Sequence, residues 1–175
     1  MHPGLYYQRV MRDTEYLYAS GRHTLAKLRR AYLKMLGILS GISVPPGVFG
    51  RGLTIPHVGS IVVNDKVRAG SFCRLHSATN IGEYRGSAPI LGNGVYVGPG
   101  AVLYGPIRLG SRSVVGANSV VNSDVPANTV VAGAPAKVVS ISAPNDSMPI
   151  HILCALDKLD GLGGDASDAR DSRDA

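Results

Sequence analysis

Aromatic residues are scarce in this chain. They make up 6% of its 175 residues and tryptophan is absent, although hydrophobic residues make up 45%. The core must therefore be filled by small and branched side chains. Cysteine is scarce as well, because Cys73 and Cys154 are the only two and they lie outside any CxxC pair. This argues against a disulfide scaffold and a structural zinc site, and predicts two buried or inert thiols.

Long apolar runs are also missing. No segment reaches the roughly 18 apolar residues that cross a bilayer, and the opening MHPGLYYQRVMRD lacks the apolar centre of a signal peptide. The length fits one domain with additions. We therefore expect a cytoplasmic protein without membrane association.

The charge is unevenly distributed. Basic and acidic residues number seven and two in residues 1–41, eight and three in residues 42–140, and three and seven in residues 141–175, for a net charge of +6. The basic residues of the middle segment are not interleaved with aromatic residues that could stack on bases, so nucleic-acid binding is not expected. A cofactor that carries phosphates matches these charges better.

Residues 5–38 have helical periodicity. In HTLAKLRRAYLKMLGIL, basic residues alternate with apolar residues spaced three or four apart, which are Leu25, Leu28, Tyr32, Met35 and Leu36. This pattern predicts an amphipathic helix that packs on its own domain and exposes a basic face. A shorter helix over residues 5–18 precedes it, and the prolines of SGISVPPG end it.

From residue 49 the apolar residues recur every six positions. The series is Phe49, Ile55, Ile61, Val67, Cys73, Thr79, Arg85, Leu91, Val97, Leu103, Leu109, Val115 and Val121. Only Thr79 and Arg85 break the pattern, and the 22 glycines of the chain suit tight corners. A period of six predicts a parallel β-helix, in which three hexapeptides close one coil of about 18 residues. Residues 49–126 supply about four such coils, and GEYRGSA, residues 82–88, is predicted to leave the coil as a loop.

The predicted organisation has three parts. An N-terminal helical segment covers residues 1–41, the β-helix covers residues 42–140, and an acidic tail covers residues 141–175. The tail is polar and without periodicity, so we expect disorder there, apart from a short helix over MPIHILCALDKL.

Four segments carry a family resemblance. They are TIPHVGSIVVN, CRLHSATNIG, APILGNGVYVGPGAVLYGPIRLG and VVGANSVVNSDVPANTVVAGAPAKVV. Together they resemble the left-handed β-helix acyltransferases, and among these the serine acetyltransferase-like enzymes, including those associated with surface polysaccharide synthesis. The resemblance implies a left-handed coil and transfer of an acetyl group from acetyl-CoA directly to a hydroxyl, without a metal or a covalent intermediate. It also implies a homotrimer, or a dimer of trimers, with active sites between subunits, and a role in cysteine biosynthesis.

Two histidines are the candidate catalytic residues. His57 stands at the position of the family's general base, and it follows the inward Ile55 by two places, so it should point outward from a corner. His76 lies one coil plus one residue later and should be close to it. We expect His76 to bind the acceptor or to handle protons, with an ordinary polar corner residue as the alternative.

The chain departs from the serine enzymes in three places. Ser87, Ala88 and Pro89 stand where that family has Arg-His-Pro, Pro56 replaces an aspartate before the base, and Ile42 replaces the aspartate that orients it. The group that orients His57 therefore stays open between a backbone carbonyl and the side chains of Asn64, Asp65 and Glu83.

Acetyl-CoA is the co-substrate that the resemblance implies, lying along the coils near their C-terminal end. Backbone groups near Gly98 and Gly116–Ala117 are candidates for binding its pantetheine arm. Lys137 in AGAPAKVV is the main candidate for its phosphates, with Arg112 as a second.

The expected function is O-acetyl transfer to serine. One alternative is the same transfer to a sugar or a surface-polysaccharide precursor, and another is a non-catalytic solenoid that serves as an assembly module. A zinc hydratase on the same fold needs three histidine ligands. Since the coil has only His57 and His76, its third ligand would have to come from His2, His23 or His151, and no metal is expected.

Overall fold

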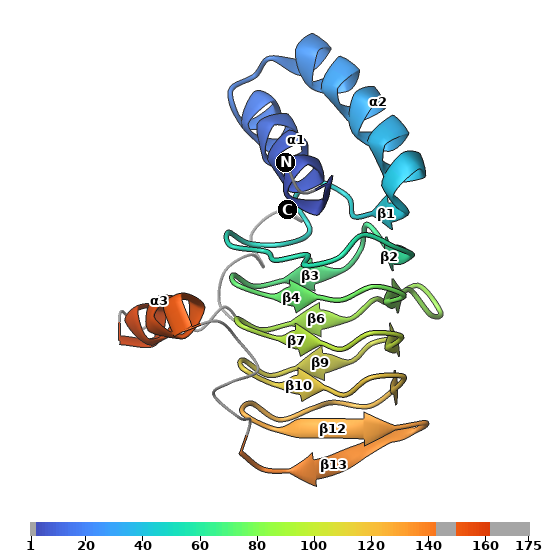
Figure 1. Cartoon of the computed structure of the whole chain (residues 1–175), viewed down its shortest axis with the longest axis vertical. Coiled ribbons are helices and arrows are strands. Elements are labelled where there is room, and N and C mark those ends of the chain that lie inside the picture. Colours follow the sequence, from blue (N-terminus) through green and yellow to red (C-terminus); the bar gives the residue numbers. More distant parts are fainter. Residues whose placement is uncertain (1–2, 143–149, 162–175) are drawn as a thin grey trace.

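The computed structural model describes residues 3–142 and 150–161. Two helices stand on one end of a stack of short strands, and a third helix lies against the side of the stack (Figure 1). The stack is a parallel β-helix with an N-terminal helical segment, which confirms the fold class expected from the sequence.

The helices are α1 (Pro3–Ala19), α2 (His23–Ser40) and α3 (Ile150–Gly161). The strands are β1 (Ile42–Ser43), β2 (Ile61–Val63), β3 (Arg68–Ala69), β4 (Arg74–Leu75), β5 (Asn80–Gly82), β6 (Ile90–Leu91), β7 (Tyr96–Val97), β8 (Val102–Tyr104), β9 (Arg108–Leu109), β10 (Val114–Val115), β11 (Val120–Val121), β12 (Val130–Gly133) and β13 (Ala136–Ser140).

The chain visits three sheets in turn. Their strand orders are β1-β2-β5-β8-β11, β3-β6-β9 and β4-β7-β10-β12-β13, with every pair parallel except β12 and β13. Val102 pairs with Val120, 18 residues later, as three hexapeptides per coil require. Side chains of the same hexapeptide phase therefore stack above one another along the coil.

The inward positions predicted from the period of six are buried. Each is at most 4% exposed, and they are Phe49, Ile55, Ile61, Val67, Cys73, Thr79, Leu91, Val97, Leu103, Leu109, Val115 and Val121. Thr79 fits among them because its hydroxyl donates a hydrogen bond to the His76 carbonyl at 2.7 Å. Burial raises the pKa of the Cys73 thiol to about 12, so this thiol is inert as expected, whereas Cys154 is a free and exposed thiol.

The predicted loop leaves the coil after β5. Asn80 pairs with Val102, 22 residues later, so this coil is four residues longer than the next one. The loop turns as a small hairpin in which Tyr84 and Ser87 exchange two backbone hydrogen bonds. Arg85 therefore stays outside the coil, exposed to solvent.

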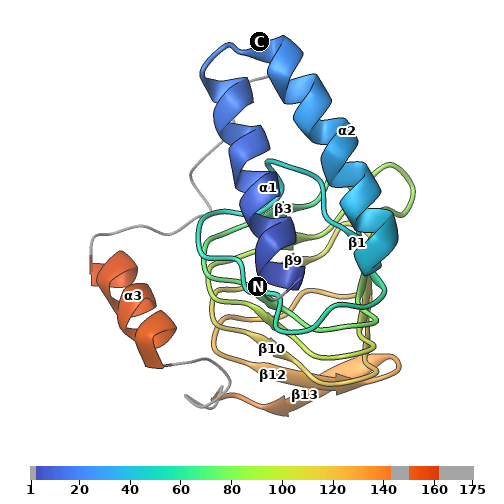
Figure 2. The ribbon, with the colours of Figure 1, turned by 45° about the horizontal axis from the view of Figure 1, so that its top comes forward.

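The helical pair covers the first end of the β-helix (Figure 2). The hydroxyl of Tyr7 donates to the Val44 carbonyl at 3.1 Å, and the guanidinium of Arg12 donates to the carbonyls of Phe49 and Gly50. Gly41 ends α2 with φ near 70°, so the helix stops before the prolines that were expected to end it.

One expectation about α2 is wrong. Its predicted core stripe faces outward, with Leu25 44%, Leu28 65% and Met35 49% exposed. The helix packs instead through Ala26 and Leu33, which are 0% and 4% exposed. The difference arises because α2 contacts only α1 and the first strands, so a narrow face is enough to cover it.

The C-terminal part closes the coil and then returns along its side. β12 and β13 form an antiparallel pair at the far end of the stack. The α3 helix, which is the short helix expected in the tail, packs Ile152 and Leu156 against Phe72 and Tyr96. The disorder expected in the tail concerns residues 143–149 and 162–175, outside the described residues. Nowhere in residues 3–142 and 150–161 is a helix long and apolar enough to cross a membrane.

Candidate active site

One corner of the β-helix brings together the site residues named from the sequence. The N–H of His76 donates to Val97, which precedes Gly98, and the N–H of Gly98 donates to Val115, which precedes Gly116. The next coil adds Ala132, the pairing partner of Lys137. We call this stack the histidine–glycine column: His57, His76, Gly98, Gly116–Ala117, and Ala132 with Lys137. Its four coil spacings span roughly 19 Å.

The two histidines lie side by side at the upper end of the column. Their ring centroids are 6.2 Å apart. The offset between paired residues falls from 20 at Thr54 to 18 at Val63, so the corner that holds His57 contains two more residues than the corner below it. This bulge absorbs the one-residue offset expected between His57 and His76.

His57 points outward, as its hexapeptide phase predicted, and its side chain is exposed. Within the described residues its imidazole has one contact, with the ring of His76, and no hydrogen bond. Ile42, which stands where the family has an orienting aspartate, is fully buried and pairs with Ile61. The ring of His76 is thus the group that limits the orientation of His57.

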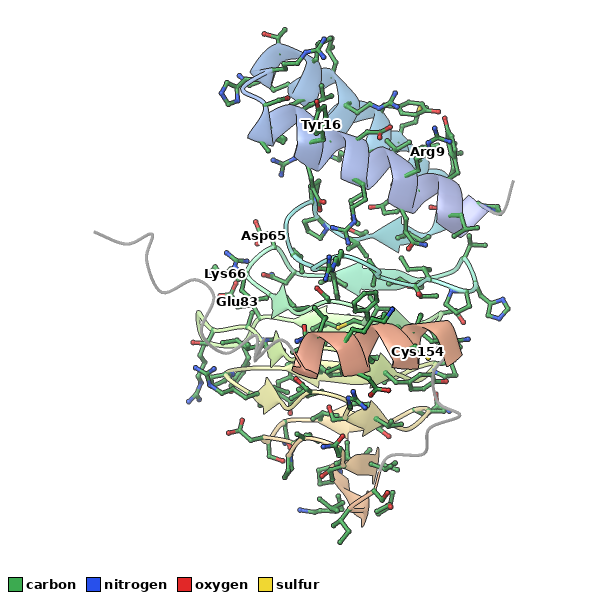
Figure 3. The ribbon with its side chains drawn as sticks, turned by 90° about the vertical axis from the view of Figure 1, so that its left-hand side faces the viewer. Arg9, Tyr16, Asp65, Lys66, Glu83 and Cys154 are labelled. Carbon is green, nitrogen blue, oxygen red and sulfur yellow. The ribbon has the colours of Figure 1, made fainter. Side chains whose placement is uncertain are left out.

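The side chains considered for orienting His57 lie at a different corner, beyond β2. Asn64 accepts the backbone N–H of Lys66 at 2.9 Å, and Glu83 forms an ion pair with the Lys66 ammonium at 3.1 Å. Asp65, Lys66 and Glu83 gather at one edge of the coil (Figure 3). These side chains therefore do not reach His57 of the same chain.

His76 is half-buried between three side chains. Its Nε2 accepts a hydrogen bond from Nε of Arg74 at 3.3 Å, and its ring lies 5.1 Å from the ring of Tyr96. Burial, and then the positive charges of Arg74 and His57, lower the pKa of His76 from its ordinary value. His76 is therefore neutral near pH 7.

Glycine allows the coils of the column to approach each other. A Cβ on Gly98 would lie 2.8 Å from the Val115 carbonyl oxygen and 2.9 Å from the Ala117 nitrogen. The N–H groups of Gly98 and Gly116 are used in coil-to-coil hydrogen bonds, so they are not free for a ligand. Within the described residues the exposed N–H of Ala117 has no partner, and it is the available backbone donor on this edge.

The two phosphate candidates are separated in the structure. Lys137 is exposed at the lower end of the column and forms no ion pair with a described residue. Arg112 lies at the other end of the β10 face, where it binds Asp157 of α3 at 2.6 Å. Lys137 is therefore the basic residue that the fold places at the column.

Sequence reasoning missed Arg74 and Tyr96. A signal for Arg74 was present, since it and His76 flank the inward Leu75 and must both point outward. Tyr96 pairs with Arg74 across the long coil, 22 residues later. Its position could not be found without knowing the length of the inserted loop.

The described residues contain no group of three His, Cys, Asp or Glu side chains that could hold a metal. His23, one possible third ligand, lies at the start of α2 against Tyr18. His2 and the side chain of His151 lie outside the described residues.

Comparisons with known proteins address the whole chain. The family described as bacterial transferase hexapeptide (six repeats) matches residues 88–123. The serine acetyltransferase of Helicobacter pylori is 34% identical over 128 residues, which are 67% of this chain and 75% of that protein. The chain belongs to the serine acetyltransferase family. The Mycobacterium tuberculosis family member is 31% identical over 85% of this chain, which spans 66% of its length.

Solved structures agree with this family. The serine acetyltransferase of Neisseria gonorrhoeae superposes with a TM-score of 0.70 at 30% identity, over 84% of this chain and 58% of its own. The same enzyme in complex with serine gives a TM-score of 0.67 at 29% identity, over 80% and 58%. A serine acetyltransferase in complex with CoA gives 0.66 at 27%, over 79% and 58%. This chain thus spans little more than half the length of these structures.

Proposed function

We propose that this protein transfers the acetyl group of acetyl-CoA to the hydroxyl of serine, with His57 as the general base. The observation that carries the proposal is the histidine–glycine column, which places the base at one end of a single backbone edge and Lys137 at the other. Family relatives solved with serine and with CoA support this choice of ligands. Cysteine biosynthesis and a cytoplasmic location are parts of the same proposal.

The reaction is a direct transfer. Neutral His57 takes the proton of the acceptor hydroxyl, and the hydroxyl oxygen bonds to the thioester carbonyl carbon. The C–S bond then breaks, and the CoA thiolate takes the proton back from His57. Exposure of His57 suits this role, because the imidazole must meet both an acceptor and a thiol.

The column suits the CoA chain. A pantetheine arm carries two amides and lies extended, so it can run along the coil edge and accept a hydrogen bond from the N–H of Ala117. Lys137 then meets the phosphates about two coil spacings, or roughly 10 Å, below Gly98.

Assembly is also part of the proposal. We propose a homotrimer with active sites between subunits, or a dimer of two such trimers. Light scattering on the purified chain tests this, and a monomer at assay concentration would contradict it.

The test is release of CoA thiol from acetyl-CoA with serine, homoserine and common sugars as acceptors. We expect release with serine. Release only with a sugar would move the acceptor to the polysaccharide alternative, and failure to bind CoA would reject the enzyme in favour of the assembly module.

The role of His57 is tested with His57→Asn. Loss of a positioned base lowers turnover by roughly 10²–10⁴-fold, while CoA binding and the melting temperature should stay unchanged because the side chain is exposed. His23→Asn is the matched control, since His23 is exposed on α2. Unchanged turnover in His57→Asn would show that another group is the base.

A further inference from the structure

The contact between Arg74 and His76 determines which ring nitrogen carries the proton. Arginine has donors only, so Nε2 of His76 must accept the hydrogen bond from Nε of Arg74 at 3.3 Å. A neutral imidazole that accepts at Nε2 has its proton on Nδ1. Arg74 therefore favours the neutral form of His76 with an N–H left at Nδ1.

The surroundings of His76 reinforce this state. The groups that face it are Arg74 from β4, His57 from the corner above and Tyr96 from β7, and none of them is an acid. Helix α3, which packs on Tyr96, contributes Asp157, whose carboxylate is bound to Arg112. No described group thus favours a protonated His76, in agreement with its lowered pKa.

Arg74 has binding capacity left. Its Nε is occupied by His76, but the guanidinium forms no ion pair with a described residue. Its side chain is half-buried, where a cation without a counter-charge is unfavourable. Two terminal N–H₂ groups remain, which is the geometry that binds a carboxylate in a bidentate manner.

We propose that Arg74 and His76 anchor the acceptor through its carboxylate: the terminal N–H₂ groups of Arg74 bind the carboxylate, and Nδ1–H of His76 donates to the same acceptor. This rests on the proposed function and assigns the acceptor to the hydroxy acids, such as serine, rather than to neutral sugars. In serine the hydroxyl and the carboxyl are separated by two carbons. One molecule can therefore present its carboxylate to Arg74 and its hydroxyl to His57 across the adjacent ring of His76.

The test compares L-serine with L-serinamide, in which an uncharged amide replaces the carboxylate. A charge-assisted contact of this kind is equivalent to about a ten- to hundredfold preference in kcat/KM. The wild type should show this preference for serine, and Arg74→Gln should lose it through a higher KM for serine, with the KM for acetyl-CoA unchanged.

Arg108→Gln is the matched control, because Arg108 is an exposed arginine on β9, in a sheet away from the column. It should keep both the rate and the preference. Serine turnover with the preference intact in Arg74→Gln would overturn the anchor alone. Absence of turnover with both acceptors, despite CoA binding, would overturn the proposed function and the anchor with it.

A second measurement does not depend on turnover. Nitrogen-15 NMR of the histidine rings, assigned by the loss of signals in His76→Gln, reports the tautomer. We expect the Nδ1–H form of His76 in the wild type, and a rise of its pKa toward the ordinary value of about 6.5 in Arg74→Gln. An Nε2–H tautomer in the wild type would show that Arg74 does not hold His76 as proposed.

Discussion

Replacing Gly98 with alanine tests whether close approach of the coils supports the column. The added Cβ would lie 2.8 Å from the Val115 carbonyl oxygen, 2.9 Å from the Ala117 nitrogen and 3.0 Å from the Gly116 carbonyl carbon. All three are backbone atoms of the next coil, so no side chain can rotate away and the coils must separate. Overpacking of this kind costs about 1–3 kcal/mol. At about 2–4 °C per kcal/mol for a chain of this size, the melting temperature should fall by about 2–12 °C.

The measurement is thermal unfolding followed by circular dichroism, together with CoA binding by calorimetry. Gly82→Ala is the control, because its Cβ would meet only the Asn80 side chain at 3.5 Å. It should be neutral or slightly stabilising, since alanine restricts the unfolded chain. Weaker CoA binding is expected only in Gly98→Ala, because the shift moves the N–H of Ala117. Equal melting temperatures for both variants would refute the packing argument.

Three further predictions concern the core and the column. At pH 8 a thiol reagent should label Cys154 in the native protein and Cys73 only after unfolding, and equal labelling rates would contradict the burial of Cys73. The pKa of Cys73 is raised from 9.0 to about 12 by folding, so the unfolded chain loses this proton first. The free energy of unfolding should therefore fall as the pH rises from 9 toward 12, by up to about 1.4 kcal/mol per pH unit, and Cys73→Ala should remove this dependence in urea titrations. Lys137→Ala should raise the Kd of CoA by roughly three- to tenfold at low salt and less at high salt, with Lys66→Ala as the unaffected control.

The period of six made most of the β-helix predictable. Inward positions depend on phase alone, so Ile55 and Leu103 could be placed in the core before any pairing was known. The same phase placed His57 outside. The stripe on α2 misled because helical periodicity shows which residues share a face but not whether a partner covers that face, and Leu28 is 65% exposed.

Register was the part that the sequence could not provide. The distance between His57 and His76 depends on a two-residue bulge at one corner, and the approach of Tyr96 depends on the four-residue extension of the loop after β5. Neither irregularity changes the hydrophobic pattern, because both leave the coil between inward positions. Local pairing, rather than composition or phase, determines these contacts.

The missing acids have a structural counterpart at this site. Where a carboxylate would orient the base, this chain has a core residue, Ile42, and His57 instead lies against His76, which is held by Arg74. A carboxylate beside the base would also repel an anionic acceptor, whereas a neutral histidine next to a guanidinium attracts one. Loss of the orienting acid and presence of Arg74 thus act in the same direction, because both make this corner of the coil suited to a hydroxyl compound that carries a negative charge.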